Sequence, residues 1–267
     1  MEFARLISGL LDAARKAGEV IRQDWRQERE IVHKGRIDLV TQTDIRVENL
    51  LREELSRLLP EARFYGEESA DGAGPGELAW VVDPLDGTTN FAHQIPFVAT
   101  SIGLWHQGRT VLAAVNAPML GELWHAVRGG GAFLNGEPIR VSKRVELLEC
   151  IVATGFPYAI ERYAERILTH LRRMLLAPRG VRRPGAAAID LAYVATGRYD
   201  GFYEYGLKPW DTAAGWLLVE EAGGRVSAMD GNSPYCLGDE GILASNGRAH
   251  DALAALLRQD LTTGPEN

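Results

Sequence analysis

The stretch Trp80–Phe91, WVVDPLDGTTNF, carries the strongest signal for both fold and chemistry in this chain. The apolar run Ala79–Val82 ends at Asp83, a pattern typical of a buried strand that delivers an acid at its end. A proline follows, and Asp86 comes two residues later, so a rigid turn holds two carboxylates. Such a pair can bind a hard cation such as Mg²⁺, with the Leu85 carbonyl as a further oxygen ligand. Taken alone, the same residues fit a solvated Asp-Pro-x-Asp-Gly turn equally well.

Gly87 and Thr88 follow this turn directly and could bind an anion. If a helix begins here, their backbone N–H groups are unpaired and lie at its positive end, which favours a phosphate. The stretch therefore offers ligands for a cation and donors for an anion within a few residues.

Three other acidic segments have ordinary interpretations when each is considered alone. Gly66–Ser69, GEES, would be a solvated surface turn. Trp210–Gly215, WDTAAG, would place Asp211 at the N-cap of a helix, and Asp38–Asp44, DLVTQTD, would do the same for Thr43 or Asp44.

Composition excludes several classes of protein. The 267 residues include 29 Lys and Arg and 36 Asp and Glu, which gives a net charge of −7 and disfavours nucleic acid as a direct partner. No uncharged apolar run approaches the roughly 20 residues that a membrane span needs. The N-terminal 25 residues carry charges, unlike a secretory signal peptide. The two cysteines, Cys150 and Cys236, form neither a disulfide framework nor a thiolate metal site, so we expect a cytoplasmic protein.

Hydrophobic periodicity predicts alternating helices and strands, which favours a layered α/β or α+β architecture. The predicted helices are 3–25, 44–59, 161–176, 186–196, 211–222 and 249–257. The predicted strands are 79–82, 97–105, 109–116, 122–128, 151–154 and 201–204, with a loop at 70–76 and a mobile turn at 33–38.

Taken together, the acidic segments resemble the inositol monophosphatase family, in the superfamily of Mg²⁺-dependent, lithium-sensitive sugar-phosphate phosphatases. The three signature regions are GEES, WVVDPLDGTTNF and WDTAAG. Supporting matches cover nearly the whole chain in the family's order: DLVTQTD (38–44), PFVATSIGL (96–104), GAFLNG (131–136) and AAAIDLAYVATGRYDGFYE (186–204). The motifs GxxxxGK(S/T), HExxH, GxSxG and CxxC are absent, which disfavours P-loop, zincin, serine-hydrolase and thiol-redox chemistry.

The resemblance implies a layered α-β-α-β-α sandwich of the inositol monophosphatase and fructose-1,6-bisphosphatase type. Residues 1–149 would form an N-terminal half with most of the metal ligands. Residues 150–267 would form a C-terminal half that carries Asp211 and Glu204. The two halves would make one compact unit and meet at the metal site.

The resemblance also assigns two or three Mg²⁺ ions per active site. Glu67, Asp83 and the Leu85 carbonyl would hold the first ion. Asp83 would bridge to a second ion, completed by Asp86 and Asp211, and Glu67 would help with a third.

Catalytic and substrate-binding roles follow from the same resemblance. Asp44 and Thr88 would orient the attacking water, with Glu67 as the third catalytic residue. The substrate would contact Asp86, the N–H groups of Gly87 and Thr88, the lining residues Gly185, Ala186 and Ala187, and Glu204, which accepts hydrogen bonds from ring hydroxyls. Lys34 matches the family's mobile lysine-bearing loop.

The implied activity is Mg²⁺-dependent hydrolysis of a phosphate monoester of a polyol or sugar, with myo-inositol 1-phosphate as the leading substrate. The residues Thr89–Phe91 resemble those of inositol monophosphatases rather than those of nucleotide bisphosphate or histidinol-phosphate phosphatases. Fructose-1,6-bisphosphatase activity stays an alternative. A second alternative is a non-catalytic role in a bacterial transcription complex through protein contacts. The family further implies lithium sensitivity and a homodimer.

Overall fold

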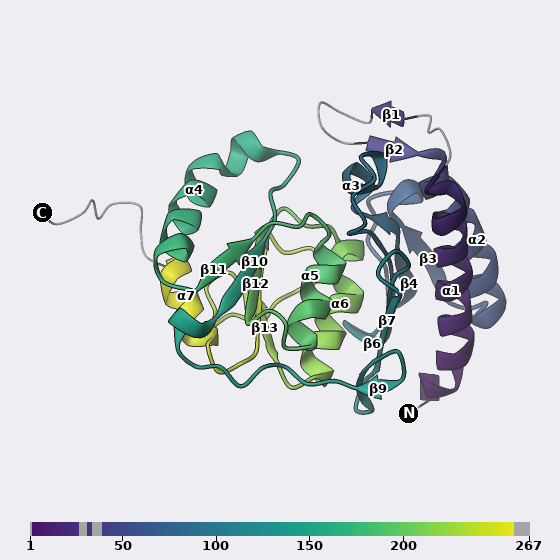
Figure 1. Ribbon diagram of the computed structural model, residues 1–267. Helices are drawn as coiled ribbons and strands as arrows, with labels where there is room; N and C mark the ends of the chain where they lie inside the picture. Colours follow the sequence, from purple (N-terminus) through teal and green to yellow (C-terminus); the bar gives the residue numbers. More distant parts are fainter. Residues whose placement is uncertain (1, 27–30, 34–38, 259–267) are drawn as a thin grey trace, which may run out of the picture.

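Two β-sheets with a pair of helices between them form the frame of the molecule (Figure 1). The computed structural model describes residues 2–26, 31–33 and 39–258. From one side to the other, the layers are α1 with α2, the larger sheet, α5 with α6, the smaller sheet, and α4 with α7 (Figure 1). The predicted α-β-α-β-α sandwich is therefore confirmed.

The larger sheet has the strand order β3-β4-β5-β6-β7-β8-β9, and only its β3–β4 pair is parallel. Its strands are β3 (Arg63–Gly66), β4 (Leu78–Asp86), β5 (Ala99–His106), β6 (Arg109–Ala117), β7 (Glu122–Val127), β8 (Gly131–Leu134) and β9 (Glu137–Pro138).

The smaller sheet has the strand order β11-β10-β12-β14-β13. Here β10 is parallel to both of its neighbours, and β14 is antiparallel to both of its own. Its strands are β10 (Ile151–Thr154), β11 (Gly180–Arg182), β12 (Gly201–Tyr205), β13 (Arg225–Ala228) and β14 (Gly241–Ser245). A separate antiparallel pair is formed by β1 (Ile31–His33) and β2 (Leu39–Thr41).

The helices cover both sheets and fill the space between them. The α-helices are α1 (Ile7–Asp24), α2 (Gln42–Leu58), α3 (Thr88–Ala92), α4 (Ile160–Leu176), α5 (Ala187–Ala195), α6 (Pro209–Glu221) and α7 (His250–Arg258). Short 3₁₀ turns are η1 (Glu2–Leu6), η2 (Glu67–Ser69) and η3 (Leu147–Glu149). Among the described residues, no helix is both long and apolar enough to cross a membrane.

Two large hydrophobic cores hold the first four layers together, and a smaller one packs α4 and α7 against the smaller sheet. One lies between α1, α2 and the outer face of the larger sheet, where Leu10, Leu51 and Trp80 are fully buried. The other lies between the sheets, around Leu191 of α5 and Leu217 of α6. Because α5 and α6 are apolar on nearly every side, both sheets can pack against them.

Several sequence-based expectations needed correction. The second helix begins at Gln42, with Thr41 rather than Thr43 or Asp44 as its N-cap. Asp44 is the third helical residue, and its side chain accepts a hydrogen bond from the Thr41 backbone in a capping box. The first turn of the predicted helix 3–25 is the 3₁₀ segment η1. The predicted strands did not include β1, β2, β3, β8, β9, β11, β13 and β14.

A buried carboxylate that is not a predicted site residue stabilises the smaller sheet. Asp200 is fully buried, and its Oδ2 accepts a hydrogen bond from the backbone of Ile151 at 2.8 Å. Its Oδ1 forms an ion pair with Arg144 at 3.2 Å and accepts a hydrogen bond from Ser142. This side chain thus fastens β10 to the start of β12.

The division of the chain into two halves, between residues 149 and 150, stays a prediction.

Candidate active site

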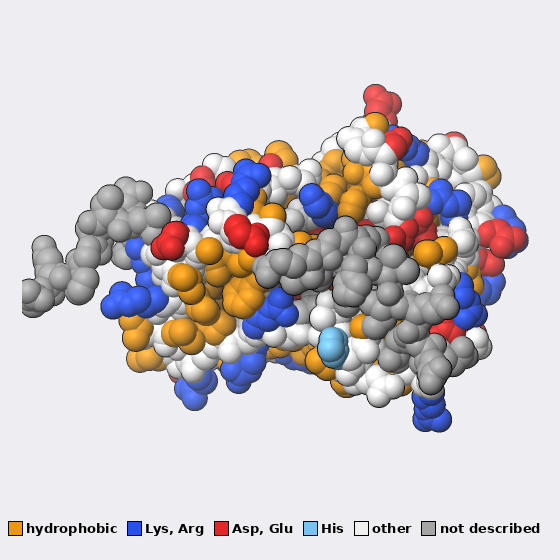
Figure 2. Space-filling model, turned by 90° about the horizontal axis from the view of Figure 1, so that it is seen from above, with side chains coloured by type: hydrophobic (Ala, Val, Ile, Leu, Met, Phe, Trp, Pro, Cys, Tyr) orange, Lys and Arg blue, Asp and Glu red, His pale blue; other side chains and the backbone are white. Residues whose placement is uncertain are grey.

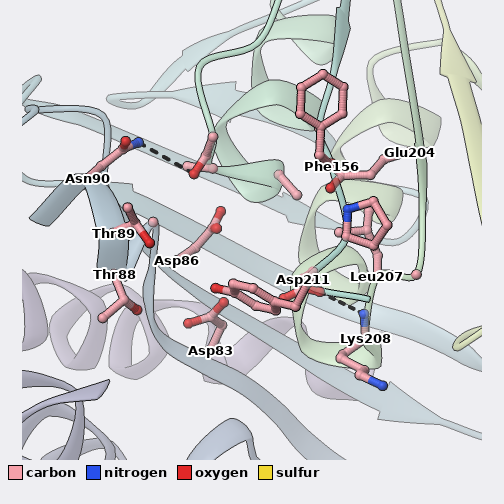
Figure 3. Close-up of a pocket in the computed structure, with 18 of the residues that line it drawn as sticks. Asp83, Asp86, Thr88, Thr89, Asn90, Phe156, Glu204, Leu207, Lys208 and Asp211 are labelled. Carbon is pink, nitrogen blue, oxygen red and sulfur yellow. Dashed lines mark hydrogen bonds between the residues drawn. The ribbon is translucent and has the colours of Figure 1, made fainter. Parts of the chain in front are cut away.

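A cavity of about 280 Å³ is lined by residues from both predicted halves of the chain. Its acidic members are Glu67, Asp83, Asp86, Glu204 and Asp211. Figure 3 shows the side chains of Asp83, Asp86 and Asp211 lying around one space, with Glu204 near Phe156 on the side of the smaller sheet. The structure therefore brings together acidic residues that are far apart in the sequence.

The parallel pairing of β3 and β4 brings Glu67 beside Asp83. Gly66, at the end of β3, is in register with Val82, so the next residue of each strand arrives at the same edge of the sheet. The register of β4 with β5 shifts between Asp83 and Asp86, which turns the chain sharply there. The N–H of Leu85 donates to Asp83 Oδ1 at 2.9 Å, and this bond stabilises the turn.

Asp86 links this turn to the other half of the chain. Its Oδ2 accepts a hydrogen bond from the N–H of Ala188 at 2.7 Å. Ala188 is the second residue of α5, and the N-cap residue Ala186 offers no side-chain acceptor. Asp86 thus satisfies one of the unpaired N–H groups at the positive end of α5.

Asp211 is the third residue of α6, not its N-cap. Its Oδ2 accepts a hydrogen bond from the backbone N–H of Lys208 at 2.7 Å, which fixes the carboxylate at the helix N-terminus (Figure 3). The neighbouring Trp210 packs on Tyr65, with ring centroids 5.6 Å apart, and so positions α6 against β3.

Burial and mutual repulsion make these carboxylates hard to ionise. Burial raises the pKa of Asp83 well above 3.8, and the charges of Glu67, Asp86 and Asp211 raise it further. Burial, followed by the charge of Asp211, raises the pKa of Asp86 to about 8. Burial raises the pKa of Asp211 to about 6, against the lowering effect of its bond to Lys208. The cluster would ionise more readily beside a cation.

The donor set fits a hard cation. Five carboxylates and Leu85, whose backbone carbonyl is a further oxygen donor, line the cavity, and oxygen ligands of this kind suit Mg²⁺. Within the part of the chain that the structure describes, no three acidic, His or Cys side chains are already gathered into a metal-binding group. The carboxylates share a cavity but are oriented by backbone N–H groups.

Thr88 and Asp44 form a buried polar pair next to the carboxylates. Thr88 Oγ1 lies 3.0 Å from Asp44 Oδ1 and 3.0 Å from the carbonyl oxygen of Leu85, and it can donate to one of them at a time. Asp44 also accepts hydrogen bonds from the N–H and hydroxyl of Thr41, at 2.8 and 2.5 Å. Burial raises the pKa of Asp44 to about 6. The pair joins α2 to the turn formed by residues 83–88.

Gly87 must be glycine for two reasons. Its φ of +89° lies in the left-handed region, and a Cβ here would lie 2.9 Å from the carbonyl oxygen of Phe97. The helix α3 begins directly after it at Thr88, as the anion-site interpretation required. Asn90, on the same helix, donates to the carbonyls of Phe97 and Pro184, at 2.9 and 3.0 Å. Asn90 thereby links residues 184–185 to the short helix α3 that follows Gly87.

Glu204 projects from β12 into a space that Gly155 leaves open. A Cβ on Gly155 would lie 2.0 Å from Glu204 Oε2. Burial raises the pKa of Glu204 well above 4.5, the charges of Asp211 and Asp86 add to the rise, and Arg183 opposes it. The predicted lining residues Gly185, Ala186 and Ala187 border the same cavity.

Some lining residues were not predicted, and one predicted residue cannot be placed. Phe156, Arg183 and Lys208 line the cavity. Arg183 lies over the Phe156 ring, 5.1 Å from its centroid. The basic pair Arg182–Arg183 in the sequence could face a substrate or a dimer partner, and a solvated surface or ion pairing explains it at least as well. Lys34 lies outside the described residues.

Comparisons with known proteins agree with this geometry. Residues 3–262 match the model of the inositol monophosphatase family. The chain is 41% identical to an inositol-1-monophosphatase of Mesorhizobium japonicum, over 98% of this chain and 99% of that protein. It is 43% identical to the Nus factor SuhB of Escherichia coli K12, over 94% of each. The crystal structure of extragenic suppressor protein suhB from Bartonella henselae is 39% identical and superposes with a TM-score of 0.91, covering 97% of this chain and 100% of that one.

The raised pKa values predict how stability depends on pH when divalent cations are removed. The folded state binds protons more tightly than the unfolded state, because the pKa values of Asp86 and Asp211, at about 8 and about 6, lie above 3.8. The contribution of these two groups to stability should therefore be fully present below about pH 4 and be lost as the pH rises through 6 and 8. We expect the thermal midpoint in EDTA to fall over this range, and Mg²⁺ to raise it again at pH 8.

The variant Asp83→Asn tests whether repulsion among the carboxylates causes this loss of stability. In EDTA at pH 8 we expect this variant to melt at least about 2–4 °C above the unchanged protein, the shift that 1 kcal/mol produces in a chain of this size. Asp71→Asn is the control, because Asp71 is exposed and forms an ion pair with Arg63. A lower melting temperature for Asp83→Asn than for the control would contradict carboxylate repulsion.

Proposed function

This chain belongs to the inositol monophosphatase family, and from that premise we propose that it hydrolyses a phosphate monoester of a polyol or sugar in a Mg²⁺-dependent reaction. The leading substrate is myo-inositol 1-phosphate. The observation that carries the proposal is the convergence of Asp83, Asp86 and Asp211 on one cavity beside the Thr88–Asp44 pair. A solvated turn would not bury Asp83, which is 2% exposed.

Two or three Mg²⁺ ions are part of this proposal. Glu67, Asp83 and the Leu85 carbonyl would hold the first ion, Asp83, Asp86 and Asp211 the second, and Glu67 would contribute to a third. Bound Mg²⁺ supplies positive charge that offsets the carboxylates, polarises the phosphate and lowers the pKa of a water molecule.

The chain's own polar groups would orient the reactants. When the Thr88 hydroxyl donates to Asp44, its lone pairs are free to accept a hydrogen bond from a water molecule. The N–H groups of Gly87 and Thr88 would bind phosphate oxygens. The water oxygen would then attack phosphorus directly as the water loses a proton, and the bond to the alcohol oxygen would break as that oxygen gains a proton. Asp44 would hold the Thr88 hydroxyl in the orientation that this step needs.

Glu204 would select the alcohol. Its carboxylate would accept hydrogen bonds from ring hydroxyls, while Gly185, Ala186 and Ala187 would contact the same side of the ring. The methyl group of Ala186 is buried and offers no hydroxyl contact.

One observation favours a bisphosphate as the second candidate substrate. Arg183 and Lys208 line the cavity and are exposed, and neither forms an ion pair with a described residue. Two such cations could bind a second phosphate, as in fructose 1,6-bisphosphate. A panel of inositol 1-phosphate, fructose 1,6-bisphosphate, histidinol phosphate and a nucleoside 3′,5′-bisphosphate would rank these substrates by kcat/KM.

A role in transcription is the candidate from another class. It rests on the 43% identity with a protein named Nus factor SuhB.

We further propose lithium inhibition, a cytoplasmic location and a homodimer. Leu168 and Leu175, on the outer face of α4, are 60% and 61% exposed, and Figure 2 shows apolar side chains gathered where α4 lies. Pull-down with transcription-elongation proteins would test the role in transcription, and light scattering would test the dimer.

Asp83→Asn is the direct test of the hydrolase. We expect phosphate release in Mg²⁺ to fall by more than about 100-fold, because even changes that only orient metal ligands cost about 10- to 100-fold. Circular dichroism should show an unchanged fold, and Asp71→Asn should keep full activity. Near-normal turnover by Asp83→Asn would contradict the proposed mechanism.

Glu204→Gln tests substrate selection separately. The amide keeps one acceptor oxygen and loses the charge, so we expect KM for inositol 1-phosphate to rise by about 10-fold. p-Nitrophenyl phosphate has no ring hydroxyls, and its KM should not change. An equal effect on both substrates would show that Glu204 acts on the reacting phosphate rather than on the alcohol.

A further inference from the structure

Glu48 is a buried carboxylate on α2 that no role above uses. Its side chain is 5% exposed, and each of its two oxygens accepts a hydrogen bond. Oε2 accepts a hydrogen bond from the backbone N–H of Glu68 at 2.8 Å. Oε1 accepts one from Arg52 at 2.9 Å. Glu48 therefore contacts the backbone one residue beyond Glu67.

Arg52 provides a second connection between α2 and this turn. The Nη2 that donates to Glu48 also donates to Ser69 Oγ at 2.5 Å. Its guanidinium group lies over the Phe64 ring of β3, 4.2 Å from the centroid. Glu48 and Arg52 together contact residues before and after Glu67.

Gly66 leaves the space that Glu48 occupies. A Cβ on Gly66 would lie 2.4 Å from Glu48 Oε2 and 2.6 Å from a Phe64 ring carbon. The φ of Gly66 is −103°, which any residue can adopt, so the glycine is needed for space and not for backbone conformation. A side chain here would push the Glu48 carboxylate away from the Glu68 N–H.

The turn that carries Glu67 is short. It is a 3₁₀ segment of three residues, Glu67–Ser69, and its N-cap Gly66 makes no side-chain capping bond. Glu48 supplies an acceptor for one of its unpaired N–H groups. Because Asp44 lies one helical turn before Glu48 on α2, the same helix face carries Asp44 toward Thr88 and Glu48 toward η2.

We infer that Glu48 is a positioning residue that holds η2 so that Glu67 faces the cavity. The inference rests on the proposed function, in which Glu67 is a metal ligand. Loss of Glu48 should weaken Mg²⁺ binding by about 10- to 100-fold, the usual cost of losing a residue that orients a ligand. At saturating Mg²⁺, kcat should stay close to that of the unchanged protein, because Glu48 contacts no substrate.

The test compares Glu48→Ala and Gly66→Ala with Asp200→Asn. Asp200 is a matched control, since this buried carboxylate also accepts a backbone N–H at 2.8 Å and pairs with an arginine, but in the smaller sheet. Calorimetric titration with MgCl₂ measures ion binding, and hydrogen exchange in EDTA measures the protection of the amides of residues 67–69. Glu48→Gln, which keeps an acceptor oxygen, serves if Glu48→Ala does not fold.

We expect weaker Mg²⁺ binding and faster exchange at residues 67–69 in both Glu48→Ala and Gly66→Ala, with Glu48→Gln intermediate. Asp200→Asn should lose thermal stability without either change. Unchanged Mg²⁺ binding in the two variants, with an active parent protein, would overturn the inference and leave the proposed hydrolase intact. If the parent protein itself binds no Mg²⁺, the proposed function fails, and the exchange rates alone decide whether Glu48 holds the turn.

Discussion

The repulsion among the carboxylates that line one cavity is the constraint on which the rest of the structure depends. Charges removed from water cost several kcal/mol each unless they have partners. Here the partners are backbone N–H groups: Asp86 accepts from the first turn of α5, and Asp211 from the residue before α6. The helices α2, α3, α5 and α6 all begin beside the site, so their positive ends face the negative cluster. Placing α5 and α6 between the sheets makes this arrangement possible.

The sequence predicts the layers better than it predicts their edges. Helical periodicity identified α1, α2 and α4 because each is long enough to show one apolar face. Short strands gave no such signal: β11 has three residues, and the five residues of β14 are all buried, so neither alternates. The N-cap of α2 was placed too late because Thr41, Thr43 and Asp44 are all good capping residues, and only the structure shows which one has extended backbone.

The site was predictable where one contiguous motif carries it. Asp83 to Thr88 combine a strand end, a turn and a helix start, so local chemistry indicated their role. Contacts that join distant segments could not be predicted from residue types. Nothing in the sequence indicates that Asp86 caps α5, and Glu48 with Arg52 has the spacing of an ordinary solvated helix pair. The structure shows that this pair is turned inward, toward η2.

The net charge of −7 has a different meaning once the site is known. An acidic protein would repel a phosphate ester, but here part of the excess charge is concentrated in one cavity that a hard cation suits. In the proposed enzyme, two or three Mg²⁺ would bring about four to six positive charges to this point. The substrate would then meet a positive site inside a protein that is acidic overall. Without cations the same carboxylates would repel the substrate as well as one another, so substrate binding and site stability would depend on the same ions.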